Sequence, residues 1–276
     1  MSRIVDAPLL IWQLFWPSLV IVAAFALLER MRPLEAHQSW RPWLFNLVWH
    51  ALFLAIFVGI MMSGWARLVS SLAAYGAAPL IAPAASGPAL WGRIAVAIIV
   101  QDALVYGGHR LMHALPVLWA FHRFHHDERN LNASTSLRQH WLTIPLHQMV
   151  VFLPLCWLFG IGATPVEMFY VLAVAGAFHH ANLRIELGCL TPWIVGPQVH
   201  RMHHARDAAS HGSNYGSLFP WWDRLLGTWQ TPVRGDFRAT GLVDCPPSSS
   251  LGNVLLRPLQ DWWRLLRPLS VSQRID

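Results

Sequence analysis

The histidines of this sequence are grouped in motifs that could bind metal ions. Of the 15 histidines, eight lie in one HxxxH motif and two HxxHH motifs. On a helix, side chains three or four residues apart share one face, so the imidazoles of each motif can converge. Imidazole suits iron, copper, zinc and nickel, and its neutral form is available near neutral pH. The motifs contain His109 and His113; His122, His125 and His126; and His200, His203 and His204.

The number of grouped histidines indicates more than one metal ion. A structural zinc ion takes four ligands and a catalytic zinc ion takes about three plus water, which is fewer than the eight in the motifs. Two adjacent cations could either activate O2 or assist hydrolysis. Binuclear hydrolases usually hold a bridging carboxylate, but few acidic residues lie near the motifs: Asp102, Asp127, Glu128, Asp207 and Asp223. The spacing alone does not distinguish iron from zinc.

The remaining histidines lie outside these motifs. His179 and His180 end an apolar segment, where a helix returning through a bilayer would reach the side that carries the motifs. A lone histidine near a membrane is more often an interfacial polar residue than a ligand. We interpret five residues in this way: His37, His50, His140, His147 and His211.

The composition indicates that a bilayer is part of the solvent around this chain. The 276 residues are 55% hydrophobic and 12% charged, with a mean hydropathy of +0.39, whereas a soluble domain carries roughly 25% charged residues. A spanning helix needs about 20 mostly apolar residues. Three segments meet this requirement, and a shorter helical hairpin follows them. The expected spans are Pro8–Leu28, Trp43–Met62 and Ala89–Gly107; the hairpin arms are Thr143–Gly160 and Pro165–Ala177, the second short enough to be re-entrant.

The distribution of arginine predicts the orientation of these spans. All 20 basic residues are Arg, and they concentrate in residues 29–42, in residues 109–139 and after residue 182. The N-terminus holds only Arg3, and the connector Ser63–Pro88 holds only Arg67. Because short cytoplasmic loops carry an excess of basic residues, we expect the N-terminus outside and the histidine motifs on the cytoplasmic face.

The sequence disfavours nucleic-acid binding, a disulfide framework and a signal peptide. The net charge of +6 could indicate nucleic-acid binding, but the arginines are dispersed beside apolar segments and fit anionic lipid headgroups better. We therefore expect no nucleic-acid partner. Cys156, Cys189 and Cys245 form no CxxC pair or disulfide framework. The first apolar stretch is long enough to span and lacks a convincing cleavage site, so we expect no signal peptide.

Several segments resemble the fatty acid hydroxylase superfamily, a membrane group that includes sterol desaturases, sterol methyl oxidases and alkylglycerol monooxygenase. The resemblance runs from Asp102 to Thr228 and is closest to the alkylglycerol monooxygenase and sterol-desaturase-like branches. The matching segments, in chain order, are the first box Asp102–His113, the second box Trp119–His126, the segment Asn132–Gln139, the isolated His180-Ala-Asn182, the last box His200–His204, and the signature in Asn214–Gly216 and Trp222–Thr228.

The resemblance implies a non-haem di-iron site, O2 as co-substrate, and two electrons from an external electron-transfer protein or other reductant. The ligands that it implies are His109, His113, His122, His125, His126, His180, His200, His203 and His204. His179 is the less favoured of its pair. Four residues are candidates for orienting imidazoles or closing the site: Asp102, Asn132, Arg138 and Asp223. One departure is Gly212, where many members have an acidic residue, and His211 is the candidate to substitute for it.

Together these features predict an all-α, multi-pass transmembrane helical bundle of about four spans, with a cytoplasmic helical cap that holds the dimetal site. Residues 1–88 would form the N-terminal spans and connector, 89–230 the catalytic domain, and 231–276 a cytoplasmic or interfacial tail. The predicted function is hydroxylation or desaturation of a lipid drawn from the bilayer, in the inner membrane if the source is bacterial. The sequence leaves open whether that lipid is a sterol, an acyl lipid, an ether lipid or a carotenoid.

Two alternatives remain from other function classes. A binuclear zinc hydrolase of lipids would use the same histidines without oxygen. A His-rich metal transporter would carry ionisable residues along its spans, whereas here such residues cluster at the span ends. Metal analysis and oxygen uptake distinguish these alternatives from the oxygenase.

Overall fold

A computed structural model describes residues 7–60, 81, 87–159, 166–207, 210, 212–243 and 246–266. Within these residues the chain forms α-helices and short 3-10 and π-helical turns, and two isolated bridges but no β-strand. The all-α prediction is therefore confirmed for the described part. Most of the predicted connector Ser63–Pro88, the turn of the predicted hairpin at residues 160–165, and His211 lie outside it.

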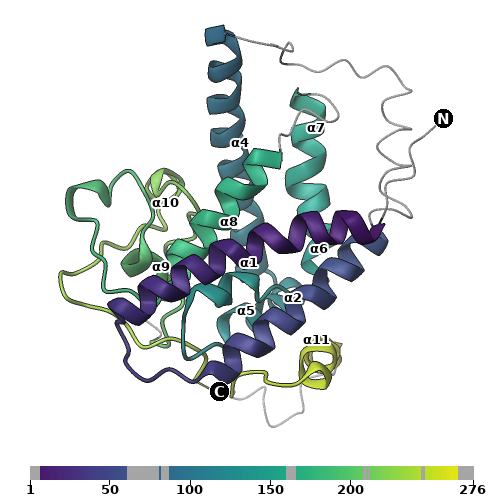
Figure 1. The fold of residues 1–276 in the computed structure, drawn as a ribbon, viewed down its shortest axis with the longest axis vertical. Helices are drawn as coiled ribbons and strands as arrows, with labels where there is room; N and C mark the ends of the chain where they lie inside the picture. The colour runs from purple at the N-terminus through teal and green to yellow at the C-terminus, as the bar shows by residue number, and fades with distance from the viewer. Residues whose placement is uncertain are drawn as a thin grey trace, which may run out of the picture.

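Three long apolar helices make up the N-terminal half. Helices α1 (Ala7–Met31) and α2 (Trp40–Ile60) pack side by side, and α4 (Gly87–Ala114) projects upward in Figure 1. Two helices in the described part are long and apolar enough to cross a membrane, over residues Trp40–Gly59 and Gly87–Ala114, and the apolar helix Thr143–Phe159 is shorter. The finding supports a membrane protein, while a total of about four spans stays a prediction.

Helix α4 connects an apolar segment to the first histidine motif. It continues past the predicted end of the third span and carries the whole HxxxH motif on its last two turns. Its upper part packs against the helical segment formed by α6 (Thr143–His147), the π-helical turn η3 (Gln148–Phe152) and α7 (Leu153–Phe159). That contact is apolar: Ala97 of α4 lies in one core cluster with Val151, Leu155 and Phe159.

The middle of the chain folds against the lower ends of these helices. Helix α5 (Pro116–His126) begins at a proline, which suits the first turn because proline has no N–H to leave unpaired. The 3-10 turn η2 (Ala133–Leu137) lies between α1, α2 and α8 (Val166–His180). A second core cluster holds this junction together, with Val22, Ala133, Leu137 and Ala177 as its buried residues.

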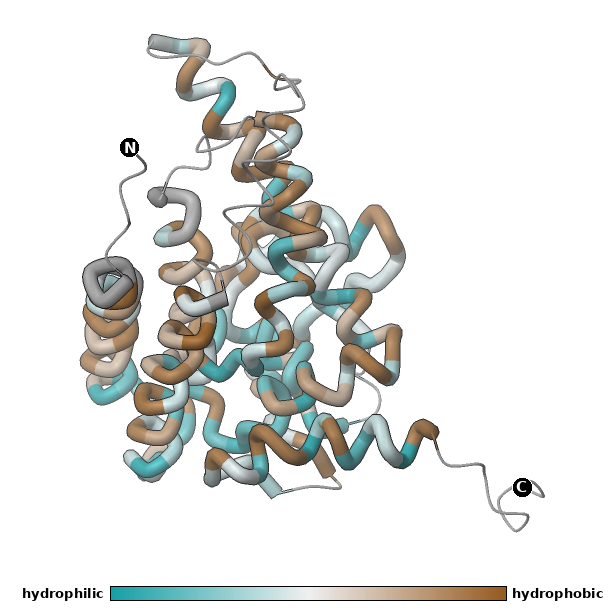
Figure 2. The backbone as a smooth tube through the Cα atoms, turned by 90° about the vertical axis from the view of Figure 1, so that its right-hand side faces the viewer, coloured by the Kyte–Doolittle hydropathy of each residue, from teal (hydrophilic) through white to brown (hydrophobic). Residues whose placement is uncertain are grey.

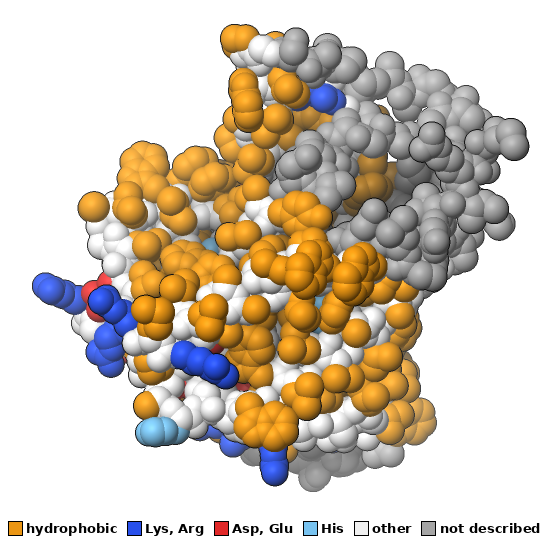
Figure 3. Space-filling model, in the orientation of Figure 1, with side chains coloured by type: hydrophobic (Ala, Val, Ile, Leu, Met, Phe, Trp, Pro, Cys, Tyr) orange, Lys and Arg blue, Asp and Glu red, His pale blue; other side chains and the backbone are white. Residues whose placement is uncertain are grey.

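The C-terminal part consists of short elements and one longer helix. The short elements are η4 (Gly188–Leu190), α9 (Pro197–His203) and α10 (Trp221–Leu225). The last helix, α11 (Leu251–Leu266), packs against α5 and lies across the lower end of the molecule in Figure 2, crosswise to α4. In Figure 3 hydrophobic side chains cover much of the visible face, whereas most of the visible arginines lie toward its lower left. This separation is expected of a chain that contacts both lipid and water.

Candidate metal centre

All nine predicted ligands lie close together in the fold, although they come from four helices. Helix α4 contributes two, α5 contributes three, α8 ends on His180, and α9 with the residue after it contributes the last three. Eight of them form two groups whose ligand nitrogens lie within 4.8 Å of one another: His109, His113, His126 and His203; and His125, His180, His200 and His204. The ninth, His122, joins the first group, since its Nε2 lies 3.2 Å from Nε2 of His126.

The two groups interleave along the chain. The neighbours His125 and His126 belong to different groups, and so do His203 and His204. The rings of His126 and His204 stack with their centroids 4.2 Å apart, so the groups adjoin. Each HxxHH motif therefore supplies nitrogens to both groups, and this arrangement suits a pair of neighbouring ions better than two independent sites.

The distances between nitrogens fit shared metal ions. The first group has Nε2–Nε2 distances of 3.0 Å between His109 and His203 and 3.1 Å between His113 and His126. In the second group, Nε2 of His180 lies 3.0 Å from that of His200. Two imidazoles on one ion, each bound at about 2.0–2.1 Å, place their nitrogens roughly 3.0–3.4 Å apart. The spacing is thus that of imidazoles which share an ion.

The tautomers of one pair strengthen this interpretation. Nδ1 of His109 lies 3.0 Å from the carbonyl oxygen of Tyr215, and Nδ1 of His203 lies 2.8 Å from that of Ser213. A carbonyl oxygen only accepts, so both Nδ1 atoms carry the proton and both Nε2 atoms present lone pairs. Two lone pairs that face each other at 3.0 Å repel unless a cation lies between them. The donor set fits a bound metal ion.

The electrostatics of the site keep these imidazoles neutral. Burial lowers the pKa of His126 well below its ordinary value, and the neighbouring imidazole of His204 lowers it further. Burial has the same effect on the pKa of His125, with His180 as the next cause, and on the pKa of His200. Neutral imidazoles are the form that binds metal, so the protein does not have to remove protons at neutral pH.

Two buried carboxylates hold the loop behind the first group. Asp223 accepts hydrogen bonds from the backbone N–H groups of Tyr215 and Gly216, each 2.8 Å, and from the hydroxyl of Thr228. Asp102 accepts from the backbone of residues 218 and 219 and from the indole N–H of Trp222. Neither belongs to a histidine group among the described residues. Asp223 therefore orients His109 indirectly, through the carbonyl of Tyr215.

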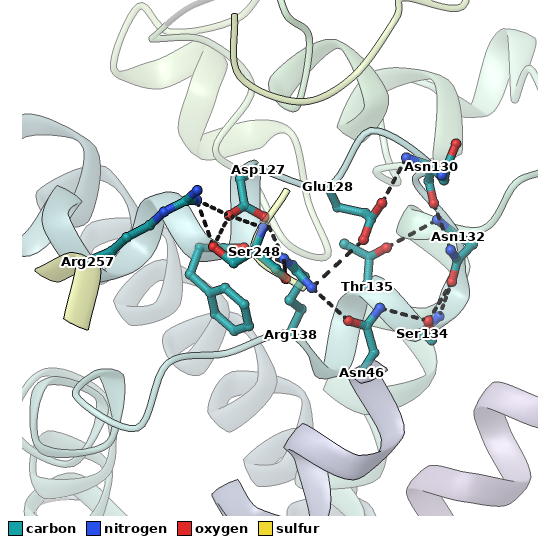
Figure 4. Close-up of polar contacts among 11 residues, drawn as sticks. Asn46, Asp127, Glu128, Asn130, Asn132, Ser134, Thr135, Arg138, Ser248 and Arg257 are labelled. Carbon is teal, nitrogen blue, oxygen red and sulfur yellow. Dashed lines mark hydrogen bonds and ion pairs between the residues drawn. The ribbon is translucent and has the colours of Figure 1, made fainter. Parts of the chain in front are cut away.

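Arg138 lies at the centre of a buried polar network beside the second histidine motif (Figure 4). Its guanidinium donates to the carbonyl of Phe124, to Asn46 Oδ1 at 3.0 Å and to Asp127 Oδ1 at 2.6 Å. Only 1% of its side chain is exposed, so this pairing is needed to offset the loss of hydration. The network fixes the end of α5 on which His125 and His126 lie.

Asn132 has a local role in the same region. Its side chain accepts from the N–H of Ser134, and its own N–H donates to Thr135 Oγ1, so it caps the 3-10 turn η2. None of the hydrogen bonds described for Asn132 is to an imidazole. The same segment reaches the second group through Gln139, whose side chain lies 3.3 Å from Nδ1 of His125.

Sequence reasoning missed two acidic residues that join the N-terminal helices to the centre. Glu29 is buried, and one of its oxygens accepts from the N–H of Ala133 at 2.7 Å and from that of Asn182 at 2.8 Å. Glu35 forms an ion pair with Arg201, which stands inside the last histidine motif. The available signal was Glu29, an acidic residue in the last turn of an apolar helix whose only other charged residue is Arg30.

The other described histidines belong to neither group. The ring of His179 is 5.4 Å from that of His200, but it is not a member of either group. His37 is exposed in the loop before α2. His50 and His140 are buried, against the expectation of interfacial positions, and His140 packs against Trp49.

Comparisons with known proteins add to this geometry. The family model described as fatty acid hydroxylase matches residues 94–228. An ornithine lipid hydroxylase of Rhizobium tropici is 29% identical over 83% of this chain and 72% of that protein. An alkylglycerol monooxygenase of Danio rerio is 32% identical over 49% of this chain, but only 30% of that protein is matched. A methylsterol monooxygenase of Aspergillus fumigatus is 28% identical over 52% of this chain and 51% of its own length. No solved structure gives a significant match.

Proposed function

We propose, from the premise that this chain belongs to the fatty acid hydroxylase superfamily, that it is a membrane-bound non-haem di-iron oxygenase. It hydroxylates or desaturates a lipid, with O2 as co-substrate and electrons from an external donor. The relatives are named as lipid hydroxylases and monooxygenases, and this supports an oxidoreductase that acts on lipid. The observation that carries the proposal is the pair of adjoining four-histidine groups.

The residues of the site would have the following roles. His109, His113, His122, His126 and His203 would hold one iron ion, and His125, His180, His200 and His204 the other. When bound, the two ions supply the O2-dependent oxidation of a C–H bond, which no side chain can perform alone. The carbonyls of residues 213, 215 and 176 hold three of the imidazoles with Nε2 directed inward. Burial of the centre excludes water from the reacting bond.

The substrate would come from the bilayer. The relatives are named for ornithine lipid, alkylglycerol and methylsterol substrates, which share an apolar body and a polar end. The relative matched over 83% of this chain is the ornithine lipid hydroxylase, so an amino-acid-containing lipid is the first substrate to test. The histidine motifs would face the cytoplasm, where a soluble or membrane-bound reductant can deliver electrons.

Metal analysis of purified variants tests the ligand assignment. The protein in detergent is expected to bind about two iron ions per chain, because two groups of histidines are present. His180→Ala removes one ligand of the second group, and His203→Ala one of the first. Each variant should retain roughly one ion and lose turnover, measured by elemental analysis and by lipid mass spectrometry for a gain of one oxygen or a loss of two hydrogens.

His37→Ala is the matched control, since His37 is exposed and belongs to neither group; it should keep the full metal content. Full iron and full activity in both ligand variants would refute the assignment. Stoichiometric zinc without oxygen uptake in the unmodified protein would instead favour a lipid hydrolase.

A further inference from the structure

The C-terminal helix α11 is attached to the rest of the molecule along one side. Val254 and Pro258 are its buried residues, and Val254 packs against Trp49 of α2 and Phe124 of α5. Asp261, on the same side, pairs with Arg123 of α5 at 2.7 Å. Since successive residues turn by about 100°, these positions form a single narrow packing face.

A second face of α11 is apolar and exposed. It carries large apolar side chains that are mostly three or four residues apart and are exposed. Their exposed fractions run from 44% to 78%, and the residues are Leu255, Leu256, Leu259, Trp263 and Leu266. Between this face and the packing face lies a third, polar face with Asn253, Gln260 and Arg264, all exposed. A water-exposed apolar strip of this size is costly and indicates a binding surface.

We propose that α11 lies in the surface of the membrane, with its apolar face among the acyl chains and its polar face toward anionic headgroups. Helices that bind in this way have an apolar face with Leu and Trp and a basic polar face. On α2, Leu44, Val48 and Leu52 form an exposed apolar row one turn apart, next to the side on which Trp49 contacts α11. Helix α11 therefore packs on a candidate span that itself carries an exposed apolar row.

The charges and the direction of α11 fit the same partner. The helix lies crosswise to α4 at the lower end of the molecule (Figure 2), the direction of a helix in a bilayer surface when α4 crosses the bilayer. Arg264 is 72% exposed, and Arg257 and Arg264 both stand at or beside the polar face. The chain carries a net charge of +6. Anionic headgroups attract such residues, whereas a second copy of this chain would bring like charges together.

Helix α11 is also connected to the second histidine motif through ion pairs. Arg257 contacts Asp127 at 3.1 Å, and Asp127 contacts Arg138 at 2.6 Å in the network of Figure 4. Helix α11 is thus linked through ion pairs to the end of α5. This surface does not depend on the proposed reaction, so its test and the metal analysis can fail separately.

Two single-cysteine variants of the full-length protein test the proposal. In a background with Cys156, Cys189 and Cys245 replaced by serine, Leu259→Cys and Gln260→Cys each receive an environment-sensitive fluorophore. The protein is reconstituted into vesicles of phosphatidylcholine with phosphatidylglycerol, and quenching is measured with acyl-chain spin-labelled lipid and with aqueous iodide. We expect the label at 259 to be quenched several-fold more by the lipid and the label at 260 several-fold more by iodide.

Gel filtration and intrinsic fluorescence establish that both labelled proteins are folded. Equal quenching of the two labels by iodide would overturn the proposal, because the apolar face would then lie in water. Protection of the label at 259 from both quenchers would also overturn it, because the face would then be covered by protein. In anionic vesicles, Arg264→Gln should reduce the quenching of the label at 259 by the spin-labelled lipid. In vesicles of phosphatidylcholine alone, the same substitution should leave that quenching unchanged.

Discussion

At the scale of single residues, three imidazoles of the centre are directed by backbone carbonyls that the histidine motifs do not contain. His109, His180 and His203 each place Nδ1 against a backbone carbonyl. Spacing identified the histidines, because the i, i+3 and i+4 rule depends only on the helix. It could not identify the carbonyls of residues 213 and 215, because these belong to a loop that reaches the site through tertiary packing, whereas the carbonyl of Gly176 lies one turn before His180 on the same helix. The sequence made Asp223 a candidate for orienting an imidazole or closing the site, and Asp223 binds the backbone of the loop behind His109.

Glu29 allows a test of whether a residue outside the histidine motifs positions a predicted ligand. Its Oε1 satisfies two buried N–H groups, on Ala133 and on Asn182, the second of which follows the predicted ligand His180 by two residues. In Glu29→Ala both donors lose their partner, at a cost of about 1–3 kcal/mol each. We expect a lower melting temperature and reduced iron content in Glu29→Ala, with partial recovery in Glu29→Gln, whose amide oxygen still accepts.

Intrinsic fluorescence during heating and elemental analysis measure the two effects. Glu186→Ala is the control, since Glu186 is exposed and accepts from the N–H of Gly235 on the surface. Unchanged iron content in Glu29→Ala would show that α1 does not position the ligand on α8.

At the scale of elements, the helices carry the ligands and the loops hold them in register. The resemblance predicted both the boxes and the helical character of the segments that carry them. It did not predict that the loop between α1 and α2 pairs with residues next to two of the motifs, through Asn182 and Arg201. Such contacts join residues about 150 positions apart, which no local pattern specifies.

The loop around Gly216, behind the first histidine group, is packed closely enough that a single added methyl group should disturb it. A Cβ on Gly216 would lie 2.7 Å from the carbonyl oxygen of Phe219 and 2.9 Å from Asp223 Oδ2. Gly216→Ala should therefore displace the carboxylate that holds the N–H of Tyr215, with loss of metal from the first group. Gly107 is the matched site: it lies on α4 beside the same motif, and a Cβ there meets nothing within 4 Å.

Gly107→Ala should leave metal content unchanged and stabilise α4 slightly, by about 0.5–1 kcal/mol, because glycine is unfavourable inside a helix. The two variants are compared by iron per chain and by melting temperature. Equal iron content and equal melting temperature in Gly216→Ala and Gly107→Ala would contradict the role of the loop in holding the first histidine group.

At the scale of the whole molecule, burial makes stability depend on pH. His140 shows this outside the metal groups, in the segment between η2 and α6. Burial lowers its pKa to about 4 from 6.5, so as pH falls from 6.5 toward 4 the unfolded chain binds a proton that the folded chain does not. Above pH 6.5 the titration of His140 does not affect the free energy of unfolding. As the pH falls from 6.5 to about 4, the free energy of unfolding decreases progressively. The buried histidines of the centre have lowered pKa values as well, so the protein as a whole should lose stability in acid.

His140→Asn isolates the contribution of one group. Asparagine keeps an acceptor for the N–H of Leu142, which lies 3.2 Å from Nδ1 of His140, but does not titrate. The melting temperature of the variant is expected to be lower than that of the parent at pH 7.5, because the ring no longer packs against Trp49 and Phe121. The gap should narrow as pH is lowered to about 4.5, since only the parent has to bury an imidazole that water would protonate. Parallel curves, with the same gap at both pH values, would mean that His140 is protonated in the fold or is solvated there.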